Sequence, residues 1–232
     1  MNRNLQSNLT GWVLIFPFVF FFTVFLVYPF VYTVVHSFTD SPLIGWGNWV
    51  GLENYQKILK DKLFGKSIYQ TFIFVAWTVI PNTVLGLLIA MMIHRIQSTI
   101  YAAIILGCFF IPHILPVTVV TDLWGSMTSN DLGIIQWIVK MFQDDPIPFF
   151  RHKVWAMPSV ALITVWWTVG FNVLLFLAGL KMINPEIYEA SDIDGANKWH
   201  KFRFITWPLI WPITALVLTL QLIFQLKIFD QM

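Results

Sequence analysis

Charged side chains gather in one short segment, residues 181–204, which separates two long apolar stretches. Asn184 and Pro185 are favoured types for a helix N-cap and a first helical residue. Gly195 stands where a left-handed C-terminal cap is expected, and a second, basic helix is predicted from Lys198. The spacing predicts a helix–turn–helix outside the apolar stretches, and its chemistry is that of ion pairs and hydrogen bonds.

A second group of polar residues lies inside the apolar stretches. Thr164, Thr168 and Asn172 are four residues apart and share one helix face, as Gln221 and Gln225 do on a later stretch. Inside a membrane such residues are functional candidates. The alternative is that they bond between helices as packing contacts. Further candidates of this kind are Thr78, Asn82 and Asp122.

The chain shows no catalytic constellation. Its histidines are scattered without a His-Glu-x-x-His pattern, its single cysteine is Cys108, and it has no Gly-x-x-x-x-Gly-Lys-Ser/Thr phosphate loop. We therefore expect no catalytic residue, no cofactor and no metal site. A membrane-embedded enzyme would need clustered acids or a nucleophile–base pair. An ion-coupled secondary transporter would usually carry an acid or base in mid-span, and Asp122 is near a span end.

The charge pattern predicts membrane helices. Five stretches contain no Asp, Glu, Lys or Arg: 4–39, 67–94, 96–121, 154–180 and 204–226. Each exceeds the roughly 20 residues that a helix needs to cross a bilayer, and a central charge would cost about 2.5–3.5 kcal/mol. The prolines within them, Pro116 included, are tolerated in membrane helices. We predict an all-α, polytopic membrane helical bundle with spans at 11–35, 69–93, 101–126, 157–180 and 205–227.

The connections differ in character. Residues 36–68 form a polar loop in which Glu53–Leu63 could be a short surface helix. Basic residues do not settle the orientation of the chain, because six would lie on one side of the membrane and eight on the other.

The charged segment resembles a known motif. Glu189-Ala190-Ser191, Asp194-Gly195-Ala196 and Ile205-Thr206-Trp207-Pro208 match the spacing of the "EAA" loop in permeases of binding-protein-dependent ABC importers. Ser191 replaces the second Ala of that pattern, and Trp207 replaces its Leu. The segments 49–55 and 170–180 resemble the carbohydrate-uptake branch, the maltose- and glycerol-phosphate-like permeases.

This resemblance implies a MetI-like permease fold and a role in ATP-driven import. The permease subunit would form half of the pathway for a sugar or sugar derivative. Implied partners are a second homologous permease, two cytoplasmic ATP-binding subunits that hold the ATPase activity, an extracytoplasmic sugar-binding protein and membrane lipid, with no nucleic acid. The implied coupling residues are Glu189, Ala190, Asp194, Gly195, Ala196 and Pro208. The pathway candidates are Thr168, Asn172, Gln221, Gln225 and Trp167, whose ring could stack on a sugar.

The resemblance also implies a topology in the bacterial cytoplasmic (inner) membrane. Residues 181–204 would be a cytoplasmic coupling loop, which makes 1–35 an N-terminal span, 36–68 an extracytoplasmic loop and 69–232 the permease core. Members of the family have six spans with both termini in the cytoplasm. Because about five are found here, we expect the C-terminal span to be missing from this sequence.

Overall fold

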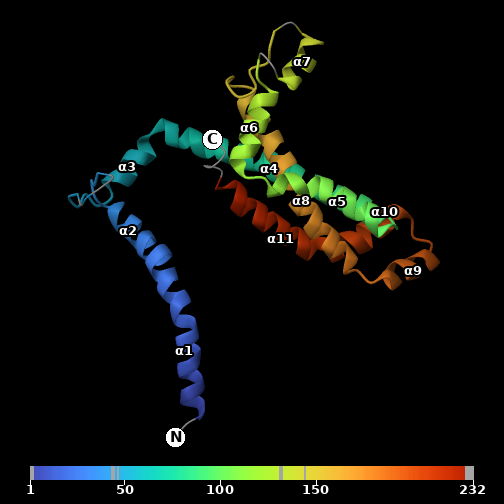
Figure 1. The fold of residues 1–232 in the computed structure, drawn as a ribbon, viewed down its shortest axis with the longest axis horizontal. Helices are drawn as coiled ribbons and strands as arrows, with labels where there is room; N and C mark the ends of the chain where they lie inside the picture. Colours follow the sequence, from blue (N-terminus) through green and yellow to red (C-terminus); the bar gives the residue numbers. More distant parts are fainter. Residues whose placement is uncertain (1–2, 43–44, 46, 131–132, 144, 228–232) are drawn as a thin grey trace. The chain divides into compact units, whose positions relative to one another are not determined.

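The structure, a computed structural model, describes residues 3–42, 45, 47–130, 133–143 and 145–227 (Figure 1). Within these ranges the regular elements are helices, and one isolated antiparallel bridge joins Thr39 to Trp49. The predicted all-α fold is confirmed. The chain divides into two compact units, Met1–Ile68 and Tyr69–Met232.

The first unit begins with one apolar helical rod. Helix α1 (Arg3–Phe22), the π-helical segment η1 (Thr23–Val27) and α2 (Tyr28–His36) follow one another without a break. Pro29 lies inside this continuous helical segment and removes one of its backbone hydrogen bonds, which membrane helices tolerate. The stretch Gly11–His36 is long and apolar enough to cross a membrane, and the span predicted at 11–35 coincides with it.

Helix α3 (Glu53–Lys60) follows the polar loop of the first unit. It ends before the predicted Leu63 because Asp61 is extended, with ψ of 116°. The Asp61 carboxylate then accepts the backbone N–H of Leu63 at 2.8 Å, which satisfies one of the free donors at the start of helix α4 (Lys62–His94). The second span therefore begins before the predicted residue 69.

The second unit contains the rest of α4 and seven further α-helices within the described ranges. They are α5 (Thr99–Ile114), α6 (Val117–Met127), α7 (Ile134–Lys140), α8 (Ala156–Lys181), α9 (Pro185–Ile193), α10 (Lys198–Lys201) and α11 (Trp207–Gln225), with the π-helical segment η2 (Phe202–Thr206) between the last two. Because α10, η2 and α11 are continuous, Lys198–Gln225 forms one candidate span, and the fifth predicted span also begins early.

Helix α8 is the centre of this unit, and α4, α5 and α11 lie beside it (Figure 1). At Gly170 the backbones of α8 and α5 meet: a Cβ atom here would lie 2.0 Å from the carbonyl oxygen of Phe109. The buried apolar core comes from α4, α8 and α11 and consists of Leu87, Ala90, Ile93, Val169, Val173, Phe176, Leu177, Leu180, Ile210 and Val217.

The third predicted span, 101–126, is wrong as one continuous helix. Helices α5 and α6 meet at a bend of 98°. Pro116 disfavours helical backbone at the residue before it, and Leu115 is indeed extended, with ψ of 135°. The described part of the chain therefore has four helices able to cross a membrane singly, and a fifth span only if the bent pair counts as one.

Candidate functional site

The charged segment folds as the predicted helix–turn–helix. Helix α9 is capped by Asn184, whose side-chain oxygen accepts the backbone N–H of Glu186 at 3.1 Å. Pro185 is its first residue, where the fixed φ of proline suits a helix. The side-chain amide of Asn184 also donates to the Glu186 carboxylate at 3.1 Å. The predicted cap and helix start are confirmed.

The turn after α9 depends on Gly195. This residue has φ of +74°, in the left-handed region that glycine enters without steric cost. Its N–H donates to the carbonyl of Asp192 at 3.1 Å, and the N–H of Ala196 donates to that of Ser191 at 2.9 Å. Asn197 then caps α10 by accepting the N–H of His200 at 2.9 Å. The predicted left-handed cap and the second short helix are both confirmed.

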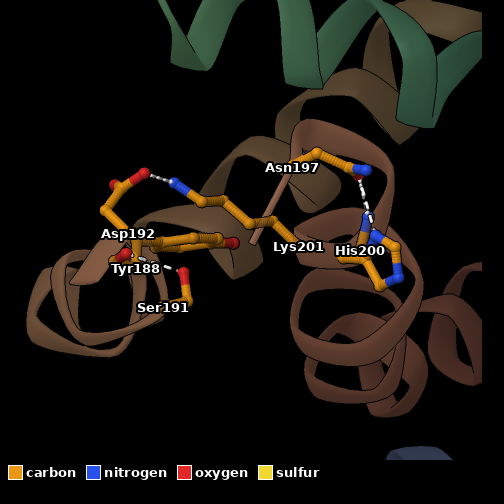
Figure 2. Close-up of polar contacts among 6 residues, drawn as sticks. All are labelled: Tyr188, Ser191, Asp192, Asn197, His200 and Lys201. Carbon is orange, nitrogen blue, oxygen red and sulfur yellow. Dashed lines mark hydrogen bonds and ion pairs between the residues drawn. The ribbon is translucent and has the colours of Figure 1, made fainter. Parts of the chain in front are cut away.

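Two side-chain contacts join the arms of this helix–turn–helix. The ammonium of Lys201 on α10 forms an ion pair with the Asp192 carboxylate on α9 (Figure 2). The hydroxyl of Tyr188 bonds the hydroxyl of Thr206 at 2.9 Å. Ser191, which is buried, donates to the Tyr188 carbonyl at 2.7 Å. We call these contacts, made by Tyr188, Asp192, Lys201 and Thr206, the loop brace.

The second arm runs directly into the last described span. Pro208 has no N–H to donate to the carbonyl of Phe204, four residues earlier, and the chain passes through 202–206 as the wider π-helix η2. Thr206, at the end of η2, is buried. The chain is therefore helical without a break from α10 to α11, and α9 is joined to this segment by the loop brace.

Most of the predicted coupling residues lie on the surface. Glu189, Ala190, Asp194, Gly195 and Pro208 are exposed, and Ala196 is half-buried. Large apolar side chains beside them are exposed too, with Ile193 at 89% and Trp199 at 66%. Exposed apolar groups next to acidic ones suit contact with another protein.

Four of the five predicted pathway residues come together in the middle of the second unit. Asn82 on α4 donates to Thr168 on α8 at 2.6 Å and to the Gln221 side-chain oxygen on α11 at 3.3 Å. Gln221 in turn donates to Asn172 at 2.9 Å, and Gln225 donates to Gln221 at 3.3 Å. All but Thr168 are at least 98% buried. We call these five residues the amide cluster.

The amide cluster retains unused hydrogen-bonding capacity. Two buried atoms in it have no partner, the side-chain oxygen of Asn82 and the side-chain nitrogen of Asn172. A buried polar atom without a partner costs roughly 1–3 kcal/mol. The cluster therefore offers one acceptor and one donor to any group that enters it.

Trp167, the fifth predicted pathway residue, lies elsewhere. Its indole N–H donates to the carbonyl of Leu115 at 3.2 Å, at the bend between α5 and α6. Its neighbour Trp166 makes an edge contact with Trp124 on α6, with ring centroids 5.5 Å apart. Both rings thus support the bent pair of helices.

Sequence reasoning missed the loop brace and the place of Asn82 at the centre of the amide cluster. Asn82 was only a further candidate, and nothing local pairs it with a residue 139 positions away. Tyr188 lies one residue before the motif that begins at Glu189, and no sequence pattern singled it out. No group of three or more His, Cys, Asp or Glu side chains that could hold a metal occurs among the described residues.

The chain is similar in sequence to proteins of one family over most of its length. Residues 65–230 match the family model described as "Binding-protein-dependent transport system inner membrane component". The trehalose/maltose transport system permease protein MalF of Thermococcus litoralis is 31% identical over an aligned region of 239 positions, gaps included. This region covers 99% of this chain and 80% of that protein. The arabinooligosaccharides transport system permease protein AraP of Bacillus subtilis is 32% identical over 93% of this chain and 68% of its own.

Solved structures show the same fold. A chain of a bacterial ABC transporter involved in the import of the acidic polysaccharide alginate superimposes with a TM-score of 0.86 at 22% identity, over 97% of this chain and 76% of the other. A chain of a bacterial alginate ABC transporter in complex with an alginate pentasaccharide-bound periplasmic protein gives 0.83 at 22% identity, over 95% and 73%.

Proposed function

The chain belongs to the family of binding-protein-dependent transport system inner membrane components, and from this premise we propose that it forms half of the membrane pathway of a sugar importer. It is a multi-pass permease of an ABC importer. In the proposal the ATPase activity resides on two cytoplasmic subunits, the other half of the pathway is a second homologous permease, and the assembly lies in a bacterial cytoplasmic membrane.

A sugar or sugar derivative is the proposed cargo, delivered by an extracytoplasmic binding protein. Two observations support this substrate class. Relatives at 31% and 32% identity are named for transport of trehalose/maltose and of arabinooligosaccharides. The amide cluster supplies both donors and acceptors, and sugar hydroxyls can pair with both. In this proposal Thr168, Asn172, Gln221 and Gln225 belong to the pathway.

Residues 181–204 form the coupling loop of the proposed importer. Helix α9 docks into a groove on an ATPase subunit, where the exposed Glu189 pairs with a basic residue and Ala190 allows close approach. Gly195 and Ala196, with Asp194, form the turn that lets the two arms fold back. Closure of the ATPases on ATP then moves α9, and the loop brace and Pro208 segment carry that movement to α11.

The observation that carries this proposal is an exposed acidic helix held rigidly to the base of a membrane span. Both Glu189→Lys and Gly195→Val should leave the membrane fold intact because the two residues are exposed and outside the core. Glu189→Lys reverses the docking charge. Gly195→Val forces a branched side chain into φ of +74° and so displaces α9. Both variants should lose co-purification of the ATPase.

A charge-matched control is Asp145→Lys. Asp145 is also an exposed acid, but it lies in the connection before α8, on the expected opposite side of the membrane. This variant should retain the ATPase at the wild-type ratio. Recovery of the ATPase with both loop variants at wild-type yield would refute the proposed docking.

A further inference from the structure

Helix α3 has two chemically distinct sides. Successive residues of an α-helix are about 100° apart around its axis, so Glu53, Lys57 and Lys60 fall on one side. The opposite side carries Tyr55, Ile58 and Leu59. Leu59 is 77% exposed, and Leu63, just beyond the helix, is 70% exposed. The apolar side of α3 is thus only partly covered by the rest of its unit.

The loop before α3 ties the helix to the end of the first span. The side-chain amide of Asn54 donates to the carbonyls of Ser37, at 3.0 Å, and Thr39, at 2.8 Å. The Tyr55 hydroxyl bonds that of Ser37 at 2.6 Å, and its ring lies 5.5 Å from that of Phe38. These residues come directly after α2, which ends at His36.

The other end of α3 is equally close to a span. Only Asp61 separates α3 from α4, whose stretch Lys62–His94 is long and apolar enough to cross a membrane. A short amphipathic helix fastened at one end to the exit of one span and at the other to the entry of the next must lie near the membrane surface.

The charge around this helix is positive. Residues 53–66 contain four lysines, Lys57, Lys60, Lys62 and Lys66, against two acids, Glu53 and Asp61, which gives a net charge of +2. Lys57 pairs with Glu53 at 2.9 Å, but both groups are more than half exposed, and an ammonium has three donors to share. Basic residues beside an apolar face are typical of helices that lie on anionic membranes.

We propose that α3 binds the lipid surface, lying flat among the headgroups of anionic phospholipids. Leu59 inserts toward the acyl chains, and Lys57 and Lys60 bind phosphate oxygens. The helix then anchors the entry of α4 at a constant depth. This assignment does not depend on which molecule the permease transports.

The test uses the single cysteine of the chain. Cys108→Ser removes the only thiol, and Leu59→Cys or Lys57→Cys then introduces one at positions about 200° apart on the same helix. Each variant is labelled with an environment-sensitive fluorophore and reconstituted with its assembled importer into vesicles of brominated phosphatidylglycerol and phosphatidylcholine. Lipid bromines should quench the label at 59 several-fold more than the label at 57, while aqueous iodide should do the reverse.

A second arm tests the charge. Replacing phosphatidylglycerol by phosphatidylcholine should reduce quenching at 59, and Lys57→Gln/Lys60→Gln should remove that dependence on lipid charge. Equal quenching at both positions would overturn the proposal. So would a label at 59 that is shielded from iodide only after an extracytoplasmic binding protein is added, since that protein would then be the occupant.

Discussion

At the scale of single residues, the contact between Tyr188 and Thr206 joins helix α9 to η2, within the last candidate span. The two hydroxyls are 2.9 Å apart, and the residues are separated by 18 positions in the chain. Thr206 is buried, whereas Glu189, one residue after Tyr188, is exposed. The proposed docking residue Glu189 and the attachment of α9 to η2 are therefore adjacent on α9, and they can be tested separately.

Tyr188→Phe removes the hydroxyl and keeps the ring. Because Glu189 is unchanged, the ATPase should still co-purify with the permease. Loss of one partly buried hydrogen bond, about 0.5–1.5 kcal/mol, should loosen the attachment of α9 to η2 and lower the amount of sugar transported per ATP hydrolysed. Tyr101→Phe, at an exposed tyrosine on α5, is the control.

Thr206→Val should reproduce the effect, although it also removes the bond from the Thr206 hydroxyl to the Lys201 carbonyl. The double variant should be no worse than Thr206→Val alone, because Tyr188→Phe removes only the contact that the two residues share. An unchanged transport-to-ATP ratio in Tyr188→Phe would exclude this role for the hydroxyl pair.

The amide cluster has two possible roles, packing and substrate binding, which predict different results. Asn172→Ala and Gln221→Ala remove polar groups that are at least 98% buried. If the cluster belongs to the pathway, as we propose, both variants should reach the membrane at normal yield and raise the KM for uptake about tenfold or more, the effect of losing roughly 1.4 kcal/mol of binding. Reduced yield with an unchanged KM would assign the cluster to packing alone. Immunoblots and initial uptake rates separate the two.

At the scale of elements, the packing of α5 against α8 depends on a glycine, which has no side chain to hold the two helices apart. The backbones of α5 and α8 approach so closely at Gly170 that a Cβ would meet the carbonyl oxygen of Phe109 at 2.0 Å. The bend between α5 and α6 lies further along the same contact, where Trp167 donates to the Leu115 carbonyl. Close approach and bend together position α6 relative to α8.

Gly170→Ala should therefore separate α5 from α8 and destabilise the bundle by about 1–3 kcal/mol, the usual cost of overpacking. The matched control is Gly107→Ala on α5, where a Cβ would meet nothing within 4 Å. That change should be neutral or slightly stabilising, because alanine favours helix over glycine by about 1 kcal/mol. Thermal unfolding of the two purified variants in detergent measures the difference. Equal midpoints would contradict the close approach.

At the scale of the whole molecule, the source of energy distinguishes an importer component from an independent carrier. In the proposed importer the energy of transport comes from partner ATPase subunits. Sugar uptake by the reconstituted assembly should require ATP and continue after an uncoupler abolishes the ion gradients. Uptake that stops with the uncoupler while ATP remains would instead support an ion-coupled carrier. Thermal stabilisation of the purified binding protein by a panel of sugars would identify the cargo.

Local rules were sufficient for much of this protein. The first span, the Asn184 cap and the left-handed Gly195 follow from hydropathy and capping, because these depend on residues within a turn or two of one another. The all-α class and the permease family could likewise be predicted from charge-free stretches and one motif. The predicted starts of the second and fifth spans were wrong, because the continuous helices that begin at Lys62 and Lys198 extend beyond the apolar stretch that enters the membrane.

Only the tertiary structure decided which distant residues meet. Asn82 meets Gln221 because α4, α8 and α11 pack with particular rotations about their own axes. Hydropathy does not determine these rotations. The break at Leu115 was equally undetermined, because Pro17 and Pro81 lie within continuous helices while Pro116 does not. Proline removes one hydrogen bond in every case. Pro116 leaves the carbonyl of Pro112 without its usual helical donor, and the Leu115 N–H donates to that carbonyl at 3.1 Å instead. The carbonyl of Leu115, at the bend, accepts the indole N–H of Trp167, which lies 52 residues further along the chain.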